Sequence, residues 1–98
     1  QLPEIDLSYS VLREASLIGT DLTWAVLRDV NLTNANLTHA HLHRANLRRA
    51  NLTTATLQQT DLRAADLSGA TIVNTVFVDS NLWGAVAPDG SPFHLNNH

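Results

Sequence analysis

Three histidines at alternate positions, His39, His41 and His43, are the first group in this sequence whose spacing could support metal chemistry. In an extended segment, His41 and His43 would project from one face at a spacing of roughly 6–7 Å. Asp21 or Asp61 could then complete a site for a divalent cation. The same three positions also fit ordinary solvent-facing residues, and no neighbouring group is evident that would orient the imidazoles. We therefore predict no metal site.

Arginines supply all six cationic side chains of the chain and form a second candidate site. Guanidinium groups suit the geometry of phosphates, so a cluster of them could bind a polyanion. However, Asp29 adjoins the cluster, the formal net charge is −3, and no aromatic platform accompanies it. We predict that the protein does not bind nucleic acid directly and that the following residues form an interaction surface for an unknown protein partner: Trp24, Arg28, Arg44, Arg48 and Arg49.

The sequence offers little for catalysis. It contains no cysteine, which excludes a thiolate nucleophile, disulfides and thiolate metal ligands. No serine or threonine is paired with a base at a recognisable spacing, and Asp21 with His41 would imitate only part of a catalytic triad. We predict a non-catalytic protein without a cofactor.

The elements that carry these side chains follow from a five-residue period. From residue 5 to residue 84, a large apolar residue returns at every fifth position, and Ala, Ser or Thr usually stands two residues before it. This spacing would rotate successive Leu side chains by about 140° around a helix and would alternate them across a strand, so neither element could bury them together. A chain that turns a corner after each short segment could bury them. The predicted core includes Leu27, Leu32, Leu37, Leu42, Leu47, Leu52, Leu57, Leu62 and Phe77.

The corners are predicted from the residues that follow each central apolar position. Gly19, Gly69, Gly84, Asn34 and Asn74 all stand two residues after it. A type II β-turn requires positive φ at its third residue, and Gly or Asn adopts this conformation at low cost. We therefore expect each turn to begin at the central apolar residue.

The pattern resembles the pentapeptide-repeat family, whose consensus reads A(D/N)LXX, and the chain is similar to its short cyanobacterial members. The resemblance covers sixteen units, for example the stretch ANLTHAHLHRANLRRANLTTATL that begins at Ala35. It implies an all-β fold, a right-handed quadrilateral β-helix with four units per coil. The four coils of 20 residues would be 5–24, 25–44, 45–64 and 65–84.

This coil length predicts which outward side chains lie above one another, because residues twenty apart would stack. Arg44 should lie over the Trp24 indole in a cation–π contact. Asp29 and Arg49 should form an ion pair, and His41 should lie between Asp21 and Asp61.

The resemblance also bears on function. Some family members resemble DNA in width and charge and bind type II topoisomerases such as DNA gyrase. Those members are longer, more acidic and dimerise through a C-terminal element, whereas this chain has an arginine-rich middle. The core positions that match the family specify its fold and not that activity. We predict a structural or protein-interaction solenoid, with DNA mimicry toward a type II topoisomerase as the alternative.

The whole chain, residues 1–98, is expected to form a single domain. No leader and no run of eighteen apolar residues is present, so we expect a soluble, cytoplasmic protein that does not enter membranes. After Leu82 the repeat decays, and Pro88 and Pro92 interrupt the ladder. Residues 85–98 are therefore expected to form a tail or a cap, through Phe93 and Leu95. If the ends stay open, an end-to-end homodimer is expected, with the C-terminal coils in contact.

Overall fold

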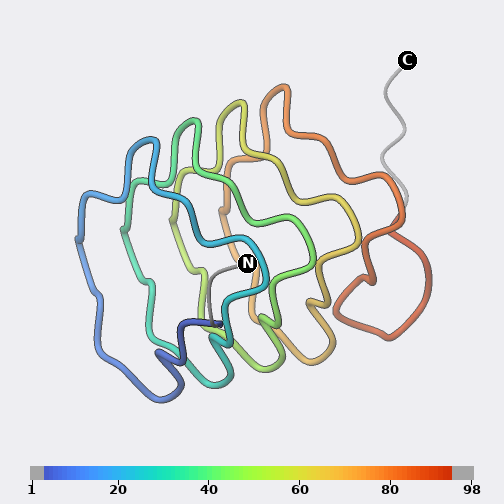
Figure 1. Ribbon diagram of the computed structural model, residues 1–98, viewed down its shortest axis with the longest axis horizontal. Helices are drawn as coiled ribbons and strands as arrows, with labels where there is room; N and C mark the ends of the chain where they lie inside the picture. Colours follow the sequence, from blue (N-terminus) through green and yellow to red (C-terminus); the bar gives the residue numbers. More distant parts are fainter. Residues whose placement is uncertain (1–3, 94–98) are drawn as a thin grey trace.

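A computed structural model describes residues 4–93 as a stack of four coils, each turning through four sides. Figure 1 shows the coils lying side by side, with the sequence running from one end of the stack to the other. The first coil spans residues 5–24, the second 25–44, the third 45–64 and the fourth 65–84. The extents of the molecule are 33 × 29 × 24 Å.

Turns of one kind join the sides of every coil. The N–H of Ala50 donates to the carbonyl of Leu47 at 3.0 Å, and the same bond recurs along the chain. The third residue of each turn has positive φ, between 53° at Gln59 and 76° at Gly84, while the second does not. This combination defines a type II turn and confirms the predicted corners. Most of these third residues are not glycine, so the coil imposes a left-handed conformation on ordinary side chains.

Hydrogen bonds between coils hold this conformation in place. Within residues 4–93 the coils pair through single bridge residues, from Asp6 with Val26 to Asp66 with Val86, and no helix or longer strand occurs. Each bridge between coils is parallel and joins residues twenty apart. At the turns the N–H of Arg49 donates to Ser68 at 2.8 Å, so even the left-handed residue belongs to the ladder.

The aspartate or asparagine that precedes many of the central residues stabilises the next turn. The Asn51 Oδ1 atom accepts the N–H of Thr53 at 3.1 Å and its hydroxyl at 2.6 Å. Asp21 makes the same two bonds with Thr23. These local bonds satisfy turn donors that would otherwise need water, which explains why short polar side chains recur at this place in the repeat.

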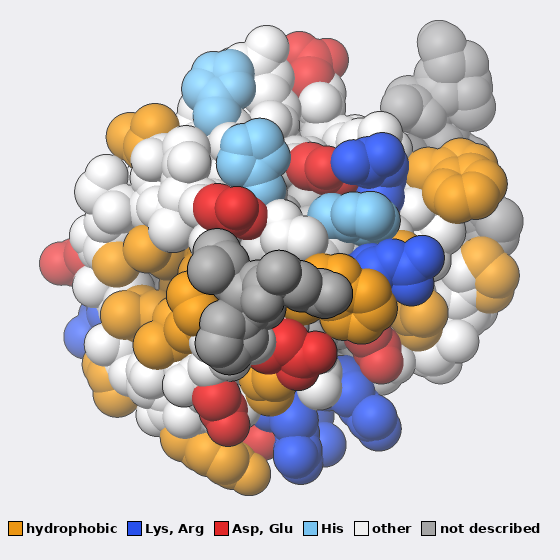
Figure 2. All heavy atoms as spheres, in the orientation of Figure 1, with side chains coloured by type: hydrophobic (Ala, Val, Ile, Leu, Met, Phe, Trp, Pro, Cys, Tyr) orange, Lys and Arg blue, Asp and Glu red, His pale blue; other side chains and the backbone are white. Residues whose placement is uncertain are grey.

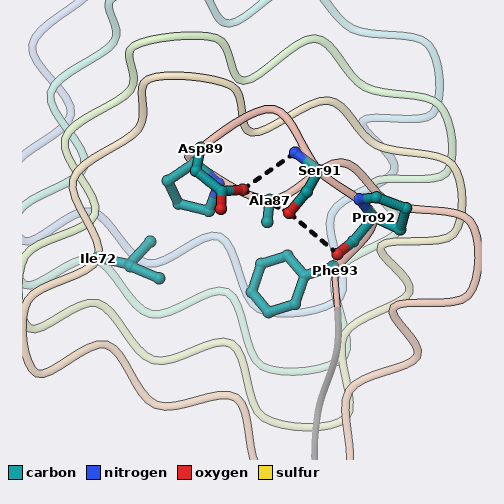
Figure 3. A pocket seen from close by; sticks show the side chains of 7 residues that line it. Ile72, Ala87, Asp89, Ser91, Pro92 and Phe93 are labelled. Carbon is teal, nitrogen blue, oxygen red and sulfur yellow. Dashed lines mark hydrogen bonds between the residues drawn. The ribbon is translucent and has the colours of Figure 1, made fainter.

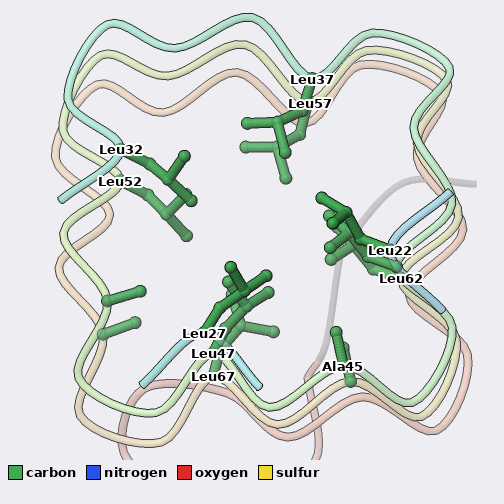
Figure 4. Close-up of a cluster of buried hydrophobic side chains, with 14 of the residues drawn as sticks. Leu22, Leu27, Leu32, Leu37, Ala45, Leu47, Leu52, Leu57, Leu62 and Leu67 are labelled. Atoms are coloured by element: carbon green, nitrogen blue, oxygen red, sulfur yellow. The ribbon is translucent and has the colours of Figure 1, made fainter. Parts of the chain in front are cut away.

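Leucine and alanine fill the axis of the stack. Figure 4 looks along it and shows leucines from all four sides pointing inward, with Leu27, Leu47 and Leu67 above one another. The exposed fraction of each of the eight predicted core leucines is 0%, whereas Phe77 in the fourth coil is only partly buried. Thr60 is buried too, and its hydroxyl donates to the Leu37 carbonyl at 2.7 Å. Burial is therefore complete in the middle coils and partial at the ends.

Residues 85–93 form a hairpin at the C-terminal end of the stack. Val86 pairs with the fourth coil through Asp66 and, on its other side, with Pro92 in antiparallel fashion. The ring of Phe93 meets the edge of the Phe77 ring at 5.6 Å between centroids. Figure 3 shows Phe93 and Ile72 beside an open, mainly apolar hollow of about 370 Å³. Leu95, the other residue expected in the tail contact, lies outside the described residues.

No helix within residues 4–93 is long and apolar enough to cross a membrane.

Candidate interaction surface

Both tryptophans lie on one side of the stack, which we call the tryptophan wall. It consists of residues 20–24, 40–44, 60–64 and 80–84, one segment from each coil. Trp24 is 44% exposed and Trp83 is 79% exposed, the largest fraction among the exposed large hydrophobic residues described. Figure 2 shows one face of the molecule on which His, Arg and acidic side chains gather, with hydrophobic side chains nearby.

Trp24 and Arg44 occupy the corner of this wall. They stand twenty residues apart, at the left-handed position of equivalent turns in successive coils, with φ of 65° and 62°. The Arg44 guanidinium carbon lies 5.1 Å from the centroid of the Trp24 indole. This distance is typical of a cation–π contact, and it confirms the predicted stack. The contact holds a flexible cationic side chain beside an aromatic surface.

The acidic residues of the tryptophan wall have partners of their own. Asp61 accepts two hydrogen bonds from Arg63, at 2.9 Å to Nε and 2.7 Å to a terminal nitrogen. These bonds lower the pKa of the Asp61 carboxyl and raise the pKa of Arg63. The hydroxyl and N–H of Thr23 lower the pKa of Asp21 in the same manner. Both carboxylates that flank His41 in the ladder are thus already engaged.

The histidines do not assemble a ligand set. His41 forms backbone bridges with Asp21 and with Asp61, as the stacking by twenty predicts. Nevertheless, no group of three or more His, Asp or Glu side chains that could hold a metal ion occurs among residues 4–93. His39 lies at a turn, one side of the coil away from His41 and His43, so the alternation in sequence does not produce one histidine cluster.

The neighbouring side of the stack, the arginine wall, carries the other predicted arginines. It consists of residues 5–9, 25–29, 45–49 and 65–69. Arg49 binds Asp29 through two hydrogen bonds of 3.1 and 2.9 Å, which confirms the predicted ion pair. Arg49 thereby lowers the pKa of Asp29, while Asp29 raises the pKa of Arg49. Arg48 lies 4.0 Å from Asp66, and Arg28 stands at the equivalent position one coil before. Carboxylates thus offset much of the positive charge.

The left-handed turns and the hydrogen bonds between coils hold the backbone of both walls. The contacts between Trp24 and Arg44 and between Asp29 and Arg49 orient those side chains. Such a surface can present an aromatic ring and a guanidinium group to another molecule. The leucines that fill the axis leave no interior site for a substrate in the middle coils.

Comparison with known proteins assigns the chain to a family. The sequence model described as pentapeptide repeats, in eight copies, matches residues 5–44 and again residues 45–84. The chain belongs to the pentapeptide-repeat family. The right-handed quadrilateral β-helix expected from the resemblance is confirmed by this match and by the solved structures to which the chain is similar.

Solved pentapeptide-repeat proteins from cyanobacteria and a plant are similar to this chain. HetL from Nostoc sp. strain PCC 7120, a protein involved in the regulation of heterocyst differentiation, is 36% identical over 90% of this chain and 43% of its own, with a TM-score of 0.60. The Nostoc protein alr5209 is 27% identical over 93% of this chain and 77% of its own, with a TM-score of 0.80. AT2G44920 from the Arabidopsis thaliana thylakoid lumen is 31% identical over 94% of this chain and 70% of its own, with a TM-score of 0.59.

The present pentapeptide-repeat chain therefore spans less than half the length of HetL. No match to the chain is found among the curated proteins. QnrB1, a plasmid-mediated fluoroquinolone resistance protein, is 24% identical with a TM-score of 0.74, a likeness that shows the fold alone.

The five residues predicted as an interaction surface fall on two adjoining walls of this pentapeptide-repeat structure. Trp24 and Arg44 contact each other on the tryptophan wall, while Arg28, Arg48 and Arg49 lie on the arginine wall. Sequence reasoning missed Trp83, although stacking by twenty places it beside Arg63. The residues one position after the central leucines of this wall are Thr23, His43, Arg63 and Trp83. Because Trp24 directly follows Thr23, stacking these residues would have placed both tryptophans on the same wall.

Proposed function

We propose that this pentapeptide-repeat protein is a non-catalytic interaction module that binds a protein partner through the tryptophan wall. The observation that carries the proposal is the placement of both tryptophans on one wall, with Trp83 79% exposed. Tryptophan and arginine are the side chains most enriched among residues that dominate protein interfaces. A monomeric solenoid gains nothing from exposing an indole, whereas a partner that covers it would gain a large apolar contact.

The partner expected at this wall has an apolar pocket rimmed by carboxylates. The Trp24 indole orients Arg44, whose guanidinium group can still donate hydrogen bonds outward. Arg63 and Arg49, in contrast, are already bound to aspartates. A carboxylate of the partner would therefore pair with Arg44 and pack beside Trp24. An arginine held in place in advance loses less side-chain entropy on binding, so this pairing is favourable.

Comparative capture from cells that make the protein naturally tests this proposal. The immobilised variants would be Trp24→Ala, Trp83→Ala and, as a control on another wall, Val73→Ala, whose side chain is also exposed. We expect a protein that is retained by the unaltered chain and by Val73→Ala but lost with either tryptophan variant. With that protein purified, calorimetry should give a loss of affinity of about thirtyfold for Trp83→Ala, which corresponds to roughly 2 kcal/mol. Equal retention by all four proteins would contradict the proposal.

DNA mimicry toward a type II topoisomerase is the alternative and needs a separate test. The likeness to QnrB1 supports only a shared fold, and the paired arginines on the walls do not favour a DNA-like charge pattern. A supercoiling assay with purified DNA gyrase decides between them. Inhibition at micromolar protein that persists in Trp24→Ala and Trp83→Ala would favour the alternative.

A further inference from the structure

Two arginines in the middle of the arginine wall place like charges one above the other. Arg28 and Arg48 occupy equivalent positions of the second and third coils, and the N–H of Asp29 donates to the Arg48 carbonyl at 3.0 Å. The backbones of the two arginines are therefore roughly 4.8 Å apart, the spacing of hydrogen-bonded strands. Like charges directly opposite each other on neighbouring strands are destabilising. An anion held between the two guanidinium groups would remove this repulsion.

Neither of these guanidinium groups is hydrogen-bonded within the described part of the chain. Arg28 is half-buried and forms no ion pair there, and Arg48 is exposed and lies 4.0 Å from Asp66, too far for a hydrogen bond. Arg49 and Arg63, by contrast, each donate two hydrogen bonds to an aspartate. The donors of Arg28 and Arg48 remain available to a ligand.

The three aspartates of the arginine wall are engaged by other groups. Asp66 accepts the N–H and the hydroxyl of Ser68, at 3.0 and 2.6 Å. Asp6 accepts the N–H two residues further on at 3.0 Å, and Asp29 is the ion-pair partner of the neighbouring arginine. None of the three is hydrogen-bonded to Arg28 or Arg48, yet their charges surround the pair and would repel a row of anions. The pair is therefore suited to one isolated anion and not to a polyanion.

Asn46 adds a neutral donor beside the two arginines. Its Oδ1 atom accepts the N–H of Arg48 at 3.1 Å, which orients the side-chain amide. The Nδ2 group makes no hydrogen bond within residues 4–93 and can donate to a ligand. A phosphate monoester has three acceptor oxygens and a charge of about −1.5 to −2 at neutral pH, which matches two cations and an amide. A carboxylate offers only two oxygens and one charge.

We propose that Arg28 and Arg48, together with Asn46, form a binding site for a phosphate monoester. A guanidinium group can donate to two phosphate oxygens at once, so each arginine binds one edge of the phosphoryl group. The phosphodiesters of nucleic acid fit less well, because each carries one charge and its neighbours along the strand would meet the aspartates of the wall. Free phosphorylated compounds and phosphorylated side chains of a protein share the chemistry that the site recognises. The site lies in the two enclosed coils and does not depend on the tryptophan wall.

NMR titration of residues 1–98 at constant ionic strength tests the site with three probes. They are inorganic phosphate, a capped peptide of glycine, phosphoserine and glycine, and the same peptide with glutamate in place of phosphoserine. The Nε–H signals of Arg28 and Arg48 should shift with both phosphorylated probes. The glutamate peptide should bind at least about tenfold more weakly, because it lacks one charge and one acceptor oxygen.

The two phosphorylated probes distinguish the sources of the ligand. An affinity for inorganic phosphate that equals or exceeds that for the phosphopeptide would assign the site to free phosphorylated compounds. Tighter binding of the phosphopeptide would assign it to a phosphorylated protein. Either result supports the site itself.

Arginine variants and a matched control locate the site. Arg28→Gln and Arg48→Gln should each lower the affinity for the phosphopeptide at least about tenfold, because a charged donor is lost. Their melting temperatures should stay nearly unchanged, since neither side chain is hydrogen-bonded in the described part of the chain. The control is Arg13→Gln. Arg13 is also exposed and without an ion pair among the described residues, but the equivalent residue of the next coil is Thr33, so no second cation lies beside it.

The control variant should bind the phosphopeptide as tightly as the unaltered chain. Four results would overturn the proposal. They are the absence of any shift at Arg28 and Arg48 with millimolar phosphorylated probes, equal binding of the glutamate peptide, an equal loss of affinity in Arg13→Gln, and a DNA duplex that binds through the same two arginines more tightly than the phosphopeptide.

Discussion

At the scale of single residues, the fold depends on a sharp division between inward and outward positions. Leu47 has coils above and below it and an exposed fraction of 0%, while the side chain of the next residue, Arg48, is 52% exposed. Leu47→Ala should lower the free energy of unfolding by roughly 2–5 kcal/mol, because the packed axis cannot collapse around the cavity. Arg48→Ala should change it by less than about 0.5 kcal/mol. Urea denaturation of both variants checks the difference, and similar losses would contradict the assignment.

Ion pairs on the walls should make stability depend on pH in the acidic range. The pKa of Asp29 is lowered by its hydrogen bonds with Arg49, and the pKa of Asp61 by those with Arg63. A carboxyl whose folded pKa is lowered stabilises the native state above its ordinary pKa of about 4 and loses that contribution as the pH falls through the folded value. Thermal melts should therefore show a falling melting temperature below about pH 4.

The control for this pH dependence replaces both carboxylates. Asp29→Asn with Asp61→Asn should have a lower melting temperature at neutral pH and a flatter profile in acid. A profile as steep as that of the unaltered chain would mean that other groups govern acid unfolding.

At the scale of the turn, the structure imposes a conformation that most of the residues do not prefer. Gln59 has φ of 53°, and its N–H donates to Val78 at 2.9 Å, so the ladder holds it in the left-handed region. Gln59→Gly should stabilise the protein by up to about 1 kcal/mol, the relief of strain minus the greater freedom of an unfolded glycine. Gln59→Val should destabilise it, because a β-branched residue tolerates this region poorly. Urea midpoints that rank the two variants in the opposite order would argue against strain in these turns.

The elements that follow the repeat were predictable from the sequence, and those that depart from it were not. The period of five predicted the turns. The coil of twenty, which the family resemblance implied, predicted the Asp29–Arg49 pair and the Trp24–Arg44 contact. The same register places Trp83 but says nothing of its exposure, because the chain leaves the repeat after the fourth coil and forms the hairpin of residues 85–93. The hairpin of residues 85–93 has no counterpart in the repeat, so the contact of its Phe93 with Phe77 could not be predicted from the register and is seen only in the structure.

At the scale of the whole molecule, two of the four coils are end coils, and only the second and third have a coil on each side. Among the leucines of residues 4–93, those from Leu27 to Leu67 have an exposed fraction of 0%, whereas Leu22 and Leu82 are slightly exposed and Leu7, Leu12 and Leu17 are only partly buried, so the two end coils contribute less burial per residue. In a solenoid, stability is approximately a sum over neighbouring repeats. An additional coil should therefore stabilise the protein, provided that it keeps the register.

A register of twenty residues sets every inward and outward position of the stack, including those on the two walls. Insertion after Ala45 tests this claim most directly, with melting followed by circular dichroism. A full twenty-residue coil should leave the chain folded with an equal or higher melting temperature. A single inserted residue should shift the downstream leucines off the axis and abolish cooperative melting. A one-residue insertion that melts as cooperatively as the unaltered chain would contradict the claim.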